Sequence, residues 1–157
     1  MKILLHTFVI CSLLTLLSCG QEEEKYVIPI EPVNFQINTN YQDKELVTPG
    51  NTKIFTAARL SGEYVGYSGL LVVCGLTPID GGTSFQLHAY DLCCPNERIR
   101  DVKLTVQDGK AKCPKCGSVY DILSGIGSVE SGPSKNGLQR YRVTPDLSKV
   151  GIFRITR

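Results

Sequence analysis

The alternation of hydrophobic and polar residues along the chain predicts an all-β protein. Residues 33–37, Val-Asn-Phe-Gln-Ile, alternate in the manner of a strand with one buried face. Residues 69–76 form a continuous apolar run, which is typical of a strand buried on both faces. Further strands are expected at residues 85–92, 102–106, 138–144 and 151–156. The sequence has no sustained 3.6-residue period, so long helices are not expected.

Turn sequences separate these expected strands. Residues 80–82, Asp-Gly-Gly, precede one strand, and residues 107–110, Gln-Asp-Gly-Lys, predict a hairpin turn that leads into Ala111. Residues 145–146, Pro-Asp, separate the last two strands. Short strands with frequent turns are typical of a sandwich or an open barrel. We therefore expect one folded β domain over residues 33–157.

The first 18 residues have the features of a secretory signal peptide. Lys2 supplies a positive charge, and residues 3–17 form an apolar run shorter than the ~20 residues that a membrane span needs. Residues 16–19, Leu-Leu-Ser-Cys, resemble the lipobox of bacterial lipoproteins. This resemblance implies cleavage before Cys19, acylation of that cysteine, and a lipid bilayer as partner. A plain secretory signal is the alternative.

Residues 19–32 are expected to be the lipid anchor and a linker. The charged run at residues 21–25 suits a solvated spacer, and Pro29 and Pro32 stiffen it. Acidic segments directly after a lipidated cysteine resemble surface-export signals. We therefore expect a lipoprotein of the cell envelope, anchored at the outer membrane or the periplasmic face, or displayed on the surface.

Net charge and histidine content exclude some classes of function and some metal ligands. The chain has 17 Lys and Arg against 15 Asp and Glu, and a net charge of +2 is too small to indicate a nucleic-acid partner. Of the two histidines, His6 lies in the predicted signal, so only His88 would remain in the mature chain.

Two cysteine motifs carry the candidate chemistry. Residues 93–97 read Cys-Cys-Pro-Asn-Glu, and residues 113–118 read Cys-Pro-Lys-Cys-Gly-Ser. Thiolates in paired turns are typical of sites for soft metals and iron–sulfur clusters. The segment from Asn96 to Cys113 is long enough for one hairpin that brings the two turns together. In the second turn we expect backbone amides to point at sulfur and Gly117 to adopt a positive φ.

The spacing of these motifs resembles that of the Rieske-type [2Fe–2S] ferredoxin domain. That family carries Cys-x-His and Cys-x-x-His motifs about sixteen residues apart, followed by a Gly-Pro. Cys94, Cys113 and residues 131–133, Ser-Gly-Pro, follow in this order, and the resemblance covers residues 33–157. It implies stacked antiparallel sheets with a small cluster-binding subdomain. It also implies a [2Fe–2S] cofactor and electron transfer to a partner protein.

The ligand positions depart from the family pattern. Asn96 stands where the family has its first histidine, and Cys116 stands where it has its second. Cys94, Cys113 and Cys116 remain as thiolate ligands, and the fourth ligand is open. Cys93 would need a bulge to reach the site, because adjacent strand residues point to opposite faces. Asn96 is a poor iron ligand, because its amide oxygen is hard and neutral.

Three alternatives remain for what the cysteine site holds. It could hold a [2Fe–2S] cluster, a single zinc or iron ion, or no metal, with the cysteines paired in disulfides. Additional thiolates would lower a reduction potential below that of a His-ligated cluster. The signal lacks a twin arginine, which favours export of the unfolded chain and disfavours a cluster inserted in the cytosol. The envelope also permits disulfides, such as Cys113–Cys116 or Cys94–Cys113.

Two classes of function follow from these alternatives. In the first, the protein transfers electrons, and Ser118 and Tyr120 donate hydrogen bonds toward sulfur. In the second, it is a structural or binding module held together by zinc or disulfides. A thiol–disulfide oxidoreductase is disfavoured because a turn and strand, not a helix, follow Cys116. The chain is too short for the second iron domain of a Rieske oxygenase. His88 is interpreted as a hydrogen-bonded strand histidine and Cys74 as a buried small hydrophobe.

Overall fold

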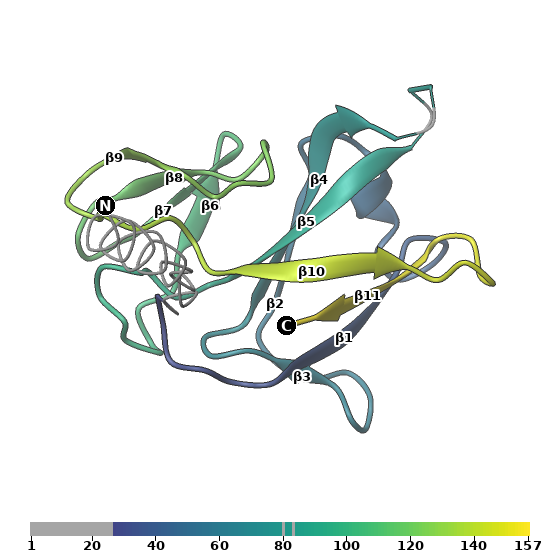
Figure 1. Ribbon diagram of the computed structural model, residues 1–157, viewed down its shortest axis with the longest axis horizontal. Coiled ribbons are helices and arrows are strands. Elements are labelled where there is room, and N and C mark those ends of the chain that lie inside the picture. Colours follow the sequence, from purple (N-terminus) through teal and green to yellow (C-terminus); the bar gives the residue numbers. More distant parts are fainter. Residues whose placement is uncertain (1–26, 80, 83) are drawn as a thin grey trace, which may run out of the picture.

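The structure, a computed structural model, describes residues 27–79, 81–82 and 84–157. The predicted signal peptide and Cys19 lie outside these residues. The described strands are antiparallel and form two sheets, a large one and a small one beside it (Figure 1). The all-β class and the stacked antiparallel sheets expected from the sequence are confirmed.

The large sheet contains seven strands in the order β2-β4-β5-β10-β11-β1-β3. Its strands are β1 (Val33–Asn38), β2 (Thr52–Phe55), β3 (Tyr64–Val65), β4 (Leu70–Pro78), β5 (Phe85–Asp91), β10 (Arg140–Pro145) and β11 (Ile152–Thr156). The strands expected at residues 33–37, 69–76, 85–92, 138–144 and 151–156 are confirmed as β1, β4, β5, β10 and β11, with bounds that differ by one or two residues. The helical content of the described residues is one short 3-10 turn, η2 (Lys44–Val47).

The small sheet contains four strands in the order β6-β7-β8-β9. These are β6 (Thr105–Gln107), β7 (Lys110–Lys112), β8 (Val119–Asp121) and β9 (Val129–Ser131). Asp108 and Gly109 both have positive φ, as a tight hairpin turn requires, so the hairpin expected at residues 107–110 is confirmed. The strand expected at residues 102–106 begins only at Thr105. Upstream, Lys103 forms a single bridge with Cys93.

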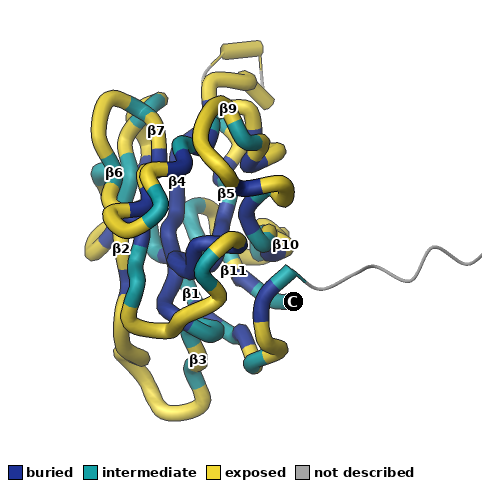
Figure 2. Tube along the Cα trace, turned by 90° about the vertical axis from the view of Figure 1, so that its left-hand side faces the viewer, coloured by how far each residue is buried: buried dark blue, intermediate teal, exposed yellow. Residues whose placement is uncertain are grey.

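Strand β4 explains the continuous apolar run at residues 69–76. Leu70, Val72 and Cys74 point into a core enclosed by the large sheet. Leu71 and Val73 point into a second core shared with the small sheet. Both faces of the strand are therefore buried over residues 70–75, whereas Leu76, at the end of the apolar run, is 56% exposed. In Figure 2 the buried part of β4 runs through the middle of the molecule. Cys74 is 1% exposed, so its interpretation as a buried small hydrophobe is confirmed.

Strands β2, β3 and β9 were not expected from the sequence. Each contains four residues or fewer, too few to establish an alternating pattern. The folded unit also begins before residue 33, because Ile28 is buried and Glu31 pairs with Arg100 at 2.7 Å. In the described part of the chain, no helical segment has the length and apolar character of a membrane span.

His88 lies in β5, as expected, but its Nε2 atom does not make the hydrogen bond expected for this residue. Its Nε2 atom is buried and has no hydrogen-bond partner in the described structure. The ring is held between two glycines, since a Cβ atom added at Gly75 or Gly125 would lie 2.4 Å from it. Burial lowers the pKa of His88, which favours a neutral ring. Packing, not hydrogen bonding, therefore fixes this side chain.

A buried carboxylate ties the large sheet to the loop before β3. The side chain of Asp43 is 0% exposed and pairs with Arg59 at 2.9 Å and with Lys53 at 3.0 Å. The Arg59 guanidinium lies over the rings of Phe35 and Phe55, at 4.7 and 4.9 Å from their centroids. Burial alone would raise the pKa of Asp43, but the hydrogen bonds from Arg59, the Asn38 amide and Lys53 outweigh it, and the pKa is lowered.

Asp43 is therefore expected to make stability depend on pH. A depressed pKa contributes stability above the ordinary value of 3.8 and loses it as pH falls through the folded-state value. Asp43→Asn should lower the free energy of unfolding by about 2 kcal/mol at pH 7. This loss is smaller than the loss on breaking a fully buried ion pair, because Lys53 and Arg59 are partly solvated. Urea unfolding at pH 7 and near pH 3 measures this, and the gap between variant and wild type should shrink in acid. A gap that stays constant would contradict the assignment.

Candidate metal centre

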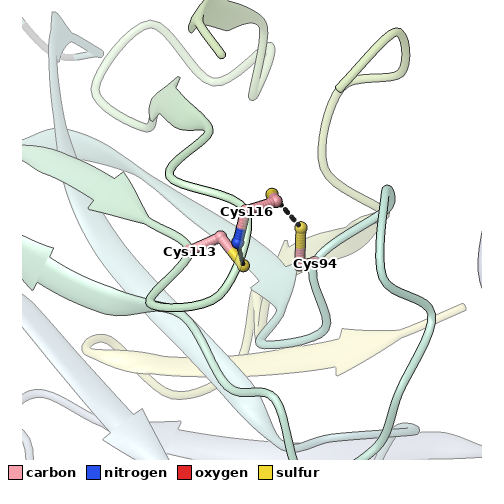
Figure 3. A group of neighbouring side chains, drawn as sticks. All are labelled: Cys94, Cys113 and Cys116. Atoms are coloured by element: carbon pink, nitrogen blue, oxygen red, sulfur yellow. Dashed lines mark hydrogen bonds between the residues drawn. The ribbon is translucent and has the colours of Figure 1, made fainter. Parts of the chain in front are cut away.

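Three cysteine sulfurs converge at the junction of the small sheet and the second core. Cys94 lies in the first loop, after β5, and Cys113 and Cys116 lie in the turn between β7 and β8 (Figure 3). Their sulfur atoms all lie within 4.8 Å of one another, and those of Cys94 and Cys116 are 3.6 Å apart. Three close cysteine sulfurs could hold a metal ion. The structure thus brings together the three residues that the sequence predicts as thiolate ligands.

The second cysteine turn has the local geometry expected from its sequence. The amide of Cys116 points at the Cys113 sulfur at 3.5 Å, and the amide of Gly117 donates to the Cys113 carbonyl at 3.1 Å. Gly117 has a φ of 74°, which disfavours residues with a side chain. The chain then enters strand β8 directly, without a helix. In a thiol–disulfide oxidoreductase, a helix N-terminus lowers the pKa of the attacking thiol. The described residues that follow Cys116 form a strand and provide no such helix.

The first cysteine loop is fixed by a buried carboxylate that the sequence did not single out. Asp91 is 0% exposed and accepts hydrogen bonds from the backbone amides of Tyr67, Ser68 and Cys93 and from the Tyr141 hydroxyl, at 2.7 to 3.1 Å. These donors lie on three separate parts of the chain. Asp91 therefore anchors the backbone immediately before Cys94 to the large sheet.

Hydroxyl groups lie beside two of the three sulfurs. The Tyr120 hydroxyl is 3.3 Å from the Cys94 sulfur, and the Cys116 thiol donates to Ser118 Oγ at 3.2 Å. Ser118 Oγ also accepts the amide of Ser134, which packs the segment after β9 against the turn. The contacts to sulfur expected for Ser118 and Tyr120 are therefore present. If the sulfurs were deprotonated, both hydroxyls could donate to them.

The electrostatic environment differs among the thiols. Burial raises the pKa of Cys113 to about 11. Burial acts in the same direction on Cys116, but its hydrogen bonds with Ser118 outweigh it and the pKa is lowered. A divalent cation would offset the repulsion among three thiolates, which otherwise keeps buried thiols protonated.

The two residues considered from the sequence as the fourth ligand, Cys93 and Asn96, do not point at the three converging sulfurs. The Cys93 thiol points toward the carbonyls of Cys94 and Ile99, at 3.6 and 3.8 Å, and burial raises its pKa to about 11. Asn96 is exposed, and its side-chain amide donates to Glu97. The five cysteines of the described residues are free thiols, so neither of the disulfides considered from the sequence is formed.

Sequence reasoning missed an ion pair between the two cysteine loops. Glu97 in the first loop pairs with Lys115 in the second, with 2.6 Å between Oε2 and Nζ. The side chain of Glu97 is only 11% exposed, although it lies in a surface loop. The sequence feature that could have indicated this pair is the position of its two residues. Glu97 directly follows Asn96, and Lys115 directly precedes Cys116. Opposite charges at those positions favour closure of the two loops.

Comparisons with known proteins assign no family to this chain. A scan against models of protein families finds no match, and a search of curated proteins finds no match either. The geometry of the three thiols therefore provides the basis for a functional assignment.

Proposed function

We propose that this protein is a Rieske-like metal protein that transfers single electrons in the cell envelope. The convergence of the Cys94, Cys113 and Cys116 sulfurs carries this proposal. Cys94 and Cys113 are buried while Cys116 is partly exposed, so a centre held by them would lie just below the surface. Iron held by these thiolates would supply a one-electron couple.

The residues present supply three of the four ligands that a [2Fe–2S] cluster requires. The spacing of the two loops, the second turn and the hydroxyls beside sulfur all support an iron–sulfur site. In such a site, the chain would hold the cluster through Cys94, Cys113 and Cys116, and Ser118 and Tyr120 would stabilise negative charge on sulfur. Thiolate ligation in place of imidazole favours a low potential, suited to donating electrons.

The compactness of the trio favours a second candidate, a structural zinc site. Zinc–sulfur bonds of ~2.3 Å in a tetrahedron place sulfurs about 3.8 Å apart. The 3.6 Å between the Cys94 and Cys116 sulfurs is close to this spacing. In this alternative, one ion would hold the two loops together, and the protein would be a structural or binding module without redox activity.

An absorption spectrum with elemental analysis distinguishes the two candidates. The protein should be purified anaerobically from its own envelope. Broad bands between about 400 and 600 nm, with iron in the protein, are expected for the electron-transfer function. Colourless protein with one zinc per chain would establish the structural module instead. A midpoint potential near +200 mV would contradict the low potential expected for thiolate ligation, because it lies in the His-ligated range.

The Tyr120 hydroxyl is expected to raise the reduction potential of an iron centre. A hydrogen bond to sulfur stabilises the more negative, reduced state, so Tyr120→Phe should lower the potential by up to about 60 mV, a tenfold change for one electron. Tyr90→Phe is the matched control, because the Tyr90 hydroxyl donates to the Ile122 carbonyl and not to sulfur. Redox titration of the iron-loaded variants measures the shift. Equal potentials for the Tyr120 variant and wild type would refute this role.

The cellular location belongs to the same proposal. Acylation of Cys19 would hold the β domain at a membrane surface, where a redox partner protein could reach the two cysteine loops. Cys19 and the acidic spacer lie outside the described residues, so their sequence pattern alone supports this part.

A further inference from the structure

Two of the three converging sulfurs are already in contact with each other. The sulfur atoms of Cys94 and Cys116 lie 3.6 Å apart and point toward each other from different loops (Figure 3). A disulfide bond is about 2.05 Å long, so the two atoms need to approach by about 1.5 Å. Rotation of the two side chains about their Cα–Cβ bonds moves the sulfurs over this range. The pair is therefore positioned to form a disulfide between the two loops.

The third sulfur is less well placed for such a bond. Cys113 is buried, and its sulfur faces the amide of Cys116 at 3.5 Å. The Cys116 sulfur faces the sulfur of Cys94 and the hydroxyl of Ser118, at 3.6 and 3.2 Å. A disulfide within the turn would require Cys116 to leave its contact with Cys94, whereas a disulfide between the loops keeps that contact. The observed side-chain directions therefore favour the pair between the loops.

Exposure selects Cys116 as the thiol that an oxidant reaches first. Cys116 is partly exposed, whereas Cys94 and Cys113 are buried. Cys93 is buried as well, and its thiol faces the carbonyl of Ile99 at 3.8 Å. A small oxidant would therefore react at Cys116, and Cys94 is the buried thiol in contact with that sulfur.

The ion pair between the loops keeps the two thiols at this distance. Lys115 directly precedes Cys116, and its Nζ atom lies 2.6 Å from a carboxylate oxygen of Glu97, three residues after Cys94. This pair closes the loops without a metal, so the sulfurs meet in the metal-free chain.

The disulfide forms by exchange with a low-molecular-weight disulfide, RSSR. The Cys116 thiolate attacks RSSR and forms a mixed disulfide, while one RS⁻ leaves. The Cys94 thiolate then attacks the Cys116 sulfur, and the second RS⁻ leaves. The two cysteines lose two electrons and two protons in total, and RSSR is reduced to two molecules of RSH.

We propose that Cys94 and Cys116 form a reversible disulfide that excludes metal from this centre. A sulfur in a disulfide is no longer a thiolate ligand, so only Cys113 would remain of the three. A bound metal conversely occupies both thiolates and protects them from oxidation. The pairing itself needs no metal, whereas the exclusion of metal rests on the proposed function.

Oxidation of the reduced, metal-free full chain with excess oxidised glutathione tests the pairing. The remaining thiols are alkylated, and tryptic peptides are analysed by mass spectrometry. Trypsin cleaves after Lys115, so Cys113 and Cys116 fall on separate peptides. We expect one dominant cross-link, between the peptide that begins at Cys116 and the peptide that ends at Arg98, and dithiothreitol should open it. A dominant link between the peptides of Cys113 and Cys116, or no cross-link, would overturn the inference.

Substitutions identify the partner of Cys116, because the peptide that ends at Arg98 also contains Cys74 and Cys93. Cys94→Ser should remove the cross-link, whereas the matched control Cys93→Ser, at the adjacent residue, should retain it. The opposite result would assign the bond to Cys93 and contradict the proposal. Fragment spectra of the wild-type cross-linked peptide separate the two neighbours, so they decide the pairing even when a variant does not fold.

Added Zn²⁺ tests the exclusion of metal. With free Zn²⁺ at ten times its dissociation constant, only about one chain in eleven is metal-free, so cross-linking should be about tenfold slower. Zn²⁺ should also be released as the disulfide forms, and Zn²⁺ retained by fully cross-linked protein would refute the exclusion. Zn²⁺ binding without any cross-link on oxidation of the metal-free chain would overturn the inference alone. A cross-link in a chain that binds no Zn²⁺ when reduced would instead contradict the proposed metal centre.

Discussion

Cys113→Ala is expected to abolish stable metal binding. Cys113 is 0% exposed, its sulfur is one of the three that converge, and its turn carries the amide of Cys116 pointed at that sulfur. Loss of an outer-shell partner alone costs up to a hundredfold in metal affinity, so loss of a thiolate ligand should cost at least that much. Zinc or iron content after dialysis, with affinity from chelator competition, measures the effect.

Cys74→Ala is the matched control for this experiment. It removes an equally buried thiol, 1% exposed, from the core enclosed by the large sheet, which the metal centre does not share. The control should retain the metal and lose only the stability that a small cavity costs, about 1 kcal/mol. Retention of metal by Cys113→Ala at the wild-type level would exclude the trio as the binding site.

Asp91→Ala is expected to produce the largest loss of stability of any single substitution considered for this protein. The change leaves the amides of Tyr67, Ser68 and Cys93 and the Tyr141 hydroxyl without their acceptor. Each of these four unsatisfied groups costs about 1 kcal/mol or more, so the free energy of unfolding should fall by at least about 4 kcal/mol. Urea unfolding measures this fall.

Tyr141→Phe calibrates the Asp91 result. It removes only one of the four hydrogen bonds, the one at 2.7 Å, and should cost about 1 kcal/mol. The Asp91 variant should also bind metal more weakly than the Tyr141 variant, because only Asp91 holds the Cys93 amide directly before Cys94. Equal stability of the two variants would show that the network does not act through the carboxylate.

The cysteine spacing was informative because the second turn is a local structure. A hydrogen-bonded turn of the form Cys-x-x-Cys-Gly has its amides and its positive φ set by adjacent residues, so Cys113, Cys116 and Gly117 could be placed from the sequence. The hairpin between the two motifs is short, and its Asp108–Gly109 turn is read from residue types alone. The meeting of Cys94 with this turn could therefore be predicted as well.

The direction in which individual side chains point could not be predicted in the same way. Cys93 and Cys94 are chemically identical neighbours, and only the packing of the first loop turns one thiol to the Ile99 carbonyl and the other to the trio. The unpaired Nε2 of His88 likewise results from close packing by Gly75 and Gly125, which lie far from it in sequence.

The sequence by itself determined the β class, the burial of both faces of β4 over residues 70–75, and the identity of the three converging cysteines. Each of these follows from periodicity or from short-range turn geometry, which adjacent residues control. Only the tertiary structure decided the acceptor role of Asp91 and the pairing of Glu97 with Lys115. Both depend on segments that fold together from distant parts of the chain, and hydrogen bonds between such segments leave no periodic pattern in the sequence.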